Sequence, residues 1–230
     1  TIEEALKLDE VRRSMNAELG LDPAVVSENG FSDIDLYIRA GNVWPYWYKF
    51  RRVDAGFRAG VLMPTGKKRT INNPASIPYG GNGLWGMYFA GDCELELKED
   101  WSVGTLIRFN TRFDQRQNQR LPVVGEQMLY AATQGIVDIE SSFTFIFSPY
   151  FRLDCIREGF GFQGYYTMII HNEDKWVDER LVKNPAVDLK APNKTSEWRS
   201  EYLTINAFYD FAKNCPERIA PILSFKWDMP

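Results

Sequence analysis

The stretch WGMYFAGDCELELK, residues 85–98, changes character at every step along the chain. Apolar Met87 and Phe89 stand at odd positions, whereas Asp92 and Glu94 stand at even ones. Successive side chains of a β-strand point to opposite faces, so this alternation predicts a strand with one apolar face and one polar face.

The same period of two returns in further stretches of the chain, near residues 33–40, 50–63, 102–114, 138–155, 160–171, 199–211 and 219–229. These predict about eight strands of roughly 8–18 residues. Ordinary strands average about 5–6 residues, whereas a tilted strand that crosses a bilayer needs about 9–11. Residues 1–20 instead predict an amphipathic helix that Thr1 could cap, and with its following loop this helix forms an N-terminal segment, 1–30.

The connections between these strands alternate in length. Those near 41–46, 98–101, 156–159 and 212–218 are short, whereas those near 64–83, 115–137 and 172–198 are long and polar. Outer-membrane barrels have short periplasmic turns and long external loops. The alternation therefore favours an all-β fold over 31–230, an antiparallel up-and-down transmembrane β-barrel with a short N-terminal helix.

Aromatic residues stand where such strands would end. The short-turn side has Trp44, Tyr46, Trp47, Tyr48 and Trp101, and the long-loop side has Trp85, Phe113, Trp198 and Trp227. Aromatic girdles at the two membrane interfaces have this distribution. The first and last strands both have a free end on the long-loop side, whereas bacterial barrels begin and end in the periplasm. We therefore expect at least one more strand at each end and a full barrel of about ten to twelve.

Composition restricts the function further. The net charge is −4 and the sequence pI about 5.2, which argues against a nucleic-acid partner. No stretch approaches the ~20 apolar residues of a membrane helix. Cys93, Cys155 and Cys215 are too widely spaced for a metal site or a disulfide framework, so we expect no metal and no cofactor.

The predicted polar faces carry many charges, and these are the candidate solute pathway. They include Asp33, Asp35, Arg39, Asp54, Arg58, Asp92, Glu94, Arg108, Arg112 and Arg152. Such groups need water or ion partners, because unpaired burial is costly. One interpretation is a hydrated conduit whose acids and bases set a local field for small polar solutes. The alternative is a ladder of salt bridges that plugs a narrow barrel.

An enzyme is not expected. His171 is the single histidine and therefore the one possible base of a Ser/His/Asp triad. Ser196 and Ser200 are the nearest serines across the following loop, and their spacing matches no triad motif.

Two segments resemble a known family. GFSDIDLYIRAG (30–41) and DAGFRAGVLMPTGKK (54–68) are similar to segments of the porin-like outer-membrane transporters associated with degradation of phenol and other aromatic compounds, and more loosely of long-chain fatty-acid channels. The matching positions are Gly30, Asp33, Gly56, Gly60, Pro64, Thr65 and Gly66. The resemblance implies a barrel in the outer membrane of Gram-negative bacteria, with lipid around it and small solutes passing through it.

Three hypotheses follow. The first is a porin-like channel in the bacterial outer membrane that passes small solutes through a charged polar lumen. The second is a soluble β-barrel or sandwich that binds a lipid-like ligand. The third is a non-conducting surface barrel that binds a partner through its long loops. The direction of the apolar face separates the first two, and conductance separates the first from the third. The oligomeric state is left open.

Overall fold

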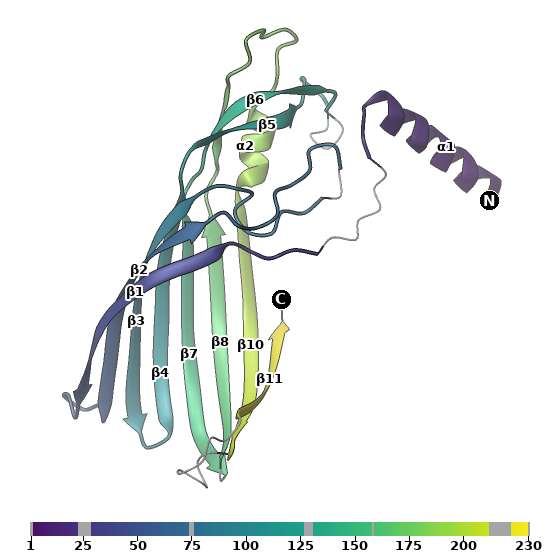
Figure 1. Ribbon diagram of the computed structural model, residues 1–230. Helices are drawn as coiled ribbons and strands as arrows, with labels where there is room; N and C mark the ends of the chain where they lie inside the picture. Colours follow the sequence, from purple (N-terminus) through teal and green to yellow (C-terminus); the bar gives the residue numbers. More distant parts are fainter. Residues whose placement is uncertain are drawn as a thin grey trace.

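The computed structural model describes residues 2–22, 29–73, 76–126, 131–157, 159–211 and 222–229. Its main feature is one curved eight-stranded sheet (Figure 1). The strands of this sheet are β1 (Ile34–Pro45), β2 (Arg52–Met63), β3 (Gly86–Lys98), β4 (Trp101–Arg112), β7 (Thr144–Arg157), β8 (Phe160–His171), β10 (Trp198–Asp210) and β11 (Ile222–Met229).

Every neighbouring pair in this sheet is antiparallel, and the strands follow one another in chain order. The predicted all-β, antiparallel, up-and-down arrangement is therefore confirmed. Closure into a barrel is not seen: within the described residues β1 pairs only with β2 and β11 only with β10, so the sheet is open between them.

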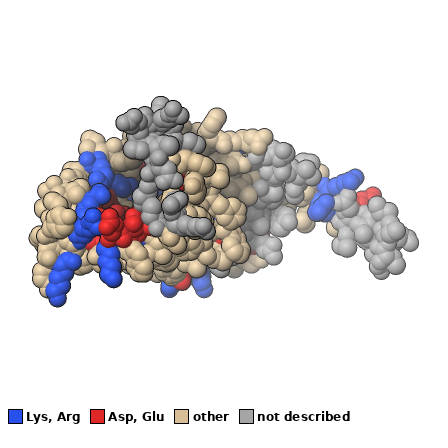
Figure 2. All heavy atoms as spheres, turned by 90° about the horizontal axis from the view of Figure 1, so that it is seen from below, with Lys and Arg blue, Asp and Glu red and all other residues tan. Residues whose placement is uncertain are grey.

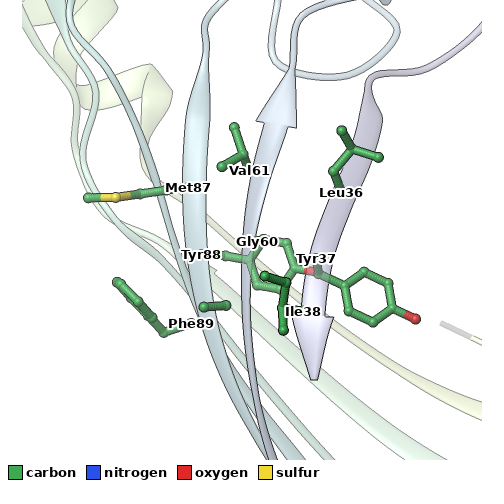
Figure 3. Close-up of a pocket in the computed structure, with 9 residues that line it drawn as sticks. Leu36, Tyr37, Ile38, Gly60, Val61, Met87, Tyr88 and Phe89 are labelled. Atoms are coloured by element: carbon green, nitrogen blue, oxygen red, sulfur yellow. The ribbon is translucent and has the colours of Figure 1, made fainter. Parts of the chain in front are cut away.

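The two faces of the sheet differ as the alternation predicts, and the apolar face is the more exposed one. In β3, Met87 and Phe89 are 36% and 48% exposed, whereas Tyr88 and Ala90, which point to the other side, are each 3% exposed. We call these sides the apolar face and the polar face. In Figure 3 Met87 and Phe89 leave one side of β3 and Tyr88 leaves the other.

The apolar face is continuous because the strand register places like residues side by side. Val61 lies opposite Met87, Phe89 opposite Phe109, and Phe109 opposite Phe145. A shallow depression of about 420 Å³ near the long-loop end of β1, β2 and β3 is lined on this face by aliphatic, Met and Phe side chains (Figure 3). An open sheet with an exposed apolar face lacks the packed interior that sheet-on-sheet folds use.

The long connections are more ordered than the sequence predicts. They contain a second, three-stranded antiparallel sheet of β5 (Gln115–Leu121), β6 (Thr133–Glu140) and β9 (Lys175–Asp178), together with α2 (Lys190–Ser196). The strand predicted across 138–155 is therefore wrong as one element: it breaks at residues 141–143 into β6 and β7. Leu121, Val137 and Ile139 form a small buried core under this sheet. Burial of these apolar side chains offsets the conformational entropy that is lost when this long connection becomes ordered.

Arg120 ties the second sheet to its surroundings. The residue is 5% exposed, and its guanidinium donates hydrogen bonds of 2.8–3.2 Å to the backbone oxygens of Leu19, Gly20, Ile71 and Ala131 and to Asn72 Oδ1. None of these oxygens carries a full charge, and burial lowers the pKa of Arg120 from its ordinary value. One side chain thus fastens β5 to three other segments.

The predicted N-terminal helix is present as α1 (Ile2–Glu18) and ends near Gly20, which has a positive φ of 61°. Its predicted amphipathic character is wrong, because its apolar residues do not gather on one face. From Glu10 to Glu18 its side chains are exposed, except Asn16, which is half-buried. Arg120 contacts the carbonyl groups at its C-terminal end, where a cation is favourable. Within the described part of the chain, neither helix has the length and apolarity needed to cross a bilayer.

All long connections leave the large sheet at one end and all short ones at the other, as predicted (Figure 1). The predicted helix cap Thr1, the connection 212–218, Cys215 and the first residues of the strand predicted at 219–229 lie outside the described residues. Trp44, Trp47 and Trp101 are exposed at the short-turn end, and Trp85 at the other. Trp198 lies at the long-loop end as the first residue of β10, is exposed, and stacks on His171 with ring centroids 5.9 Å apart.

Candidate functional site

The predicted charges gather on the polar face of β1 to β4 and β7. Seen from the short-turn end, basic and acidic side chains lie mainly together on one part of the molecule, and most of the other described atoms in view are neither (Figure 2). The charges are joined into pairs by strand register and curvature.

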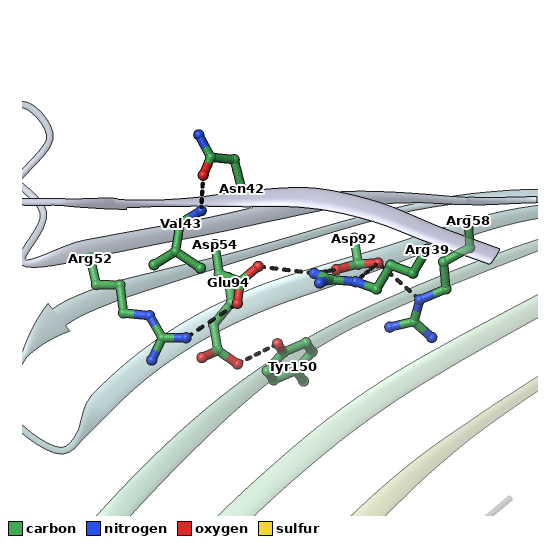
Figure 4. Close-up of polar contacts among 9 residues, drawn as sticks. All are labelled: Arg39, Asn42, Val43, Arg52, Asp54, Arg58, Asp92, Glu94 and Tyr150. Atoms are coloured by element: carbon green, nitrogen blue, oxygen red, sulfur yellow. Dashed lines mark hydrogen bonds and ion pairs between the residues drawn. The ribbon is translucent and has the colours of Figure 1, made fainter.

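Arg39 on β1 is the centre of the largest group. Its guanidinium donates to Asp54 on β2 at 2.9 Å and to Asp92 on β3 at 2.6 Å, and Asp92 also accepts from Arg58 at 3.0 Å (Figure 4). Two arginines and two aspartates thus alternate across three strands. The group is partly exposed, with side-chain exposures of 18–36%, so the pairs order the charges more than they stabilise the fold.

Gly56 makes this arrangement possible. It lies in β2 between Arg39 and Asp92, with Gly41 opposite it on β1 and Asp92 opposite it on β3. A Cβ atom at Gly56 would stand 2.7 Å from Cζ of Arg39. The guanidinium therefore lies flat over the bare backbone of β2 in order to reach β3, which no larger residue would allow.

A second group lies nearer the short turns. Arg52 contacts Asp54 at 3.2 Å, Glu94 accepts a hydrogen bond of 2.7 Å from the Tyr150 hydroxyl, and Arg152 contacts Asp154 at 2.8 Å. A cavity of about 200 Å³ opens among these strands. Its lining residues are Arg52, Glu94, Glu96, Asp100, Trp101, Ser102, Arg152 and Asp154. Four carboxylates face two arginines there, so an excess of negative charge would attract small cations.

Arg108 and Asp35 meet across the curved sheet. The Arg108 guanidinium lies 3.6 Å from the centroid of the Tyr88 ring and 3.4 Å from Asp35. Tyr88 in turn lies over Gly60, where a Cβ atom would stand 2.4 Å from the ring. The Gly60–Tyr88–Arg108 stack holds the cation against the wall of the sheet.

Asp33 and Arg112 lie at the long-loop end of the sheet, where they contact the connection between β2 and β3. Asp33 precedes β1, and its carboxylate accepts hydrogen bonds from the amides of Gly66 and Gly81 and from Arg112 at 2.8 Å. Arg112 also donates to the Leu84 carbonyl. These two residues anchor the 64–85 connection to the long-loop end of the sheet. Of the other eight predicted residues, seven form ion pairs further along the polar face, and Glu94 accepts from the Tyr150 hydroxyl.

His171 does not form the arrangement considered for an enzyme. Its Nδ1 lies 2.8 Å from the Thr144 hydroxyl and its Nε2 lies 3.2 Å from Asp174 Oδ1. Ser196 instead donates to the Asn193 carbonyl and accepts from the Asp174 amide. The imidazole thus links the ends of β7 and β8 where both strands leave the large sheet. Within the described residues no cluster of three or more His, Cys, Asp or Glu side chains could hold a metal ion.

The uncharged members of the polar face are not among the predicted site residues. Tyr88, Tyr150 and Tyr165 alternate in phase with the charged residues, and that phase is the signal that could have identified them. On β8 and β10 the polar face is mainly hydroxyl and amide groups, and β11 adds the Lys226–Asp228 pair, so most of the charge lies on the other side of the sheet.

The positions that carry the family resemblance have structural roles. Gly56 and Gly60 admit Arg39 and Tyr88, as described, and the Thr65 hydroxyl accepts from the Ile34 amide at the start of β1. Comparison of the whole chain with protein-family models and with curated proteins finds no match.

Proposed function

We propose that the chain is part of an outer-membrane β-barrel of a Gram-negative bacterium, and that it passes small solutes along its charged polar face. The exposure of the apolar face supports this proposal most directly. A protein in water turns its charged face outward, whereas a barrel in lipid turns its apolar face outward and its polar face to the lumen. Strand lengths, alternating connections and aromatic residues at the strand ends agree with the second case.

The polar face has the properties of a selective wall. Its ion pairs lie along neighbouring strands, so each arginine is held beside its carboxylate in the wall. Rings of fixed charge select between cations and anions in known pores. The resemblance of residues 30–41 and 54–68 to porin-like transporters of aromatic compounds is consistent with this function and suggests weakly polar or aromatic solutes.

The test is conductance of the full-length protein in planar bilayers under a salt gradient. We expect discrete channels, and we expect Arg58→Gln and Arg108→Gln to shift the reversal potential towards cation selectivity. Arg199→Gln is the matched control. Arg199 pairs with Glu201, and both residues lie on the same side of β10 as Leu203, which is the apolar face and not the lumen wall. Absence of channels from correctly folded protein would favour the non-conducting surface barrel. Protein that stays monodisperse in buffer without detergent would favour the soluble one.

A further inference from the structure

A second cavity opens on the less charged part of the polar face, over β8, β10 and β11. Its volume is about 270 Å³. Its lining residues are Tyr165, Thr167, Tyr202, Thr204, Asn206 and Lys226. The register accounts for this grouping, since Tyr165 pairs with Thr204, Thr167 with Tyr202, and Asn206 with Lys226.

The base of this cavity is formed by two buried threonines whose hydroxyl groups already have partners. Thr167 Oγ1 lies 2.8 Å from Ser148 Oγ, and Thr204 Oγ1 donates to Asp228 Oδ1. These bonds fix the threonine side chains before any solute arrives. A preformed pocket with a few convergent polar groups is the usual form of a small-molecule site.

The charge of this cavity is balanced. Lys226 is the charged residue of its lining, and its ammonium group lies 3.6 Å from the Asp228 carboxylate. An anion would compete with Asp228 for Lys226, and a cation would meet the ammonium group. This balance favours a solute without net charge.

Asn206 presents an amide group to the cavity that it lines. Its Oδ1 atom is buried and has no hydrogen-bond partner among the described residues. Because that atom is closed to solvent, a solute in the cavity meets the Nδ2 group of Asn206, which can donate to a hydroxyl oxygen. A hydroxyl group can both donate and accept, and therefore suits the amide, the tyrosine hydroxyls and the ammonium group together.

We propose that this cavity binds a neutral polyhydroxylated solute, a small sugar or polyol, on the wall of the lumen. Hydroxyl groups of the solute bind Asn206 and Lys226, and its C–H surface lies against the rings of Tyr165 and Tyr202. The inference rests on the proposed function, because it identifies one class of solute that the channel carries. The strongly charged side of the sheet and this less charged side would then bind different solutes.

The test measures binding separately from transport. Glucose and sorbitol are titrated into detergent-solubilised full-length protein, with saturation-transfer NMR as the readout, and benzoate serves as the anionic comparison. We expect both polyols to bind, and we expect Asn206→Leu to weaken their binding about tenfold, as the loss of one buried hydrogen bond does. Tyr202→Phe, which removes one hydroxyl group, should weaken binding less without changing the shape of the cavity.

Ser224→Leu is the control, because Ser224 lies on the same face of β11 but does not line the cavity. It should bind both polyols as the wild type does. Tighter binding of benzoate than of glucose, or equal polyol binding by wild type and both site variants, would overturn the proposal. A protein that conducts but binds neither polyol refutes this inference and keeps the proposed function. A protein that binds both polyols but never conducts keeps the binding site and refutes the proposed function.

Discussion

Replacement of Phe57 by arginine tests what the apolar face touches. Phe57 is the sixth residue of the twelve in β2 and is 53% exposed. With a rise of about 3.3 Å per residue and a strand tilt of about 40°, it lies roughly 13–15 Å from either end of the strand. Phe57 would therefore lie in the middle of the apolar band of a membrane barrel, which is about 25 Å tall.

The size of the effect differs sharply between lipid and water. An arginine at the midplane of a bilayer costs a barrel about 2–4 kcal/mol, and near an interface about 0–1 kcal/mol. Leu97→Arg is the control, because Leu97 is also exposed, at 43%, but lies one residue from the short-turn end of β3, where the register shifts. In water the added charge would change stability by about 0.5 kcal/mol or less at either position, since both side chains are exposed.

Part of the stability lost in Phe57→Arg comes from removal of the phenyl ring, which stacks on Phe89 with centroids 6.0 Å apart. Phe57→Ala removes this contact without adding a charge, and an aromatic pair contributes about 0.5–1.5 kcal/mol. The cost of the charge is therefore the difference between Phe57→Arg and Phe57→Ala.

The assay is urea unfolding of the full-length protein in phosphatidylcholine vesicles, followed by tryptophan fluorescence. Lipid contact predicts that Phe57→Arg lowers the folding equilibrium constant about thirty- to a thousandfold relative to Phe57→Ala, while Leu97→Arg changes it less than about tenfold. Equal effects of the two arginines would refute the assignment of the apolar face to lipid, and the channel proposal would fail with it.

Three further predictions concern the polar face and the second sheet. Gly56→Ala displaces the Arg39 guanidinium, because the new Cβ would stand 2.7 Å from it, so the reversal potential should shift as in Arg39→Gln. Arg120→Met leaves buried carbonyl groups unpaired and should destabilise β5 and β6 locally by about 2–4 kcal/mol, measured as faster amide exchange. The Arg180 guanidinium lowers the pKa of the Asp178 carboxyl group, so this pair stabilises β9 above about pH 4, and the protection of β9 amides should fall as the pH drops through that lowered pKa.

Each of these predictions has a control and a contradicting result. An unchanged reversal potential in Gly56→Ala would mean that Arg39 does not act in the lumen. Arg116→Met should leave amide exchange nearly unchanged, because the Arg116 side chain is mostly exposed and its contact with Glu179 is 3.5 Å long. Asp178→Asn should abolish the loss of protection in acid, and a loss that persists in this variant would assign it to another group.

The sequence by itself determined the strands of the large sheet and the chemical difference between their faces. Both follow from a local rule, because side chains of an extended chain alternate between two sides whatever the chain packs against. The alternation of Met87, Phe89 and Leu95 with Tyr88, Asp92 and Glu94 was sufficient for β3, and the lengths of the connections were sufficient for the up-and-down order.

Only the tertiary structure decided which residues meet across strands and how the long connections fold. Arg39 reaches Asp92 because Gly56 happens to lie between them in the register, and Arg120 collects carbonyl groups from segments as far as 101 residues away. No local pattern encodes such contacts, because they depend on the relative placement of strands that are distant in sequence. The second sheet escaped prediction for the same reason: its short strands are stabilised by one another and by Arg120 rather than by a strong alternation of their own.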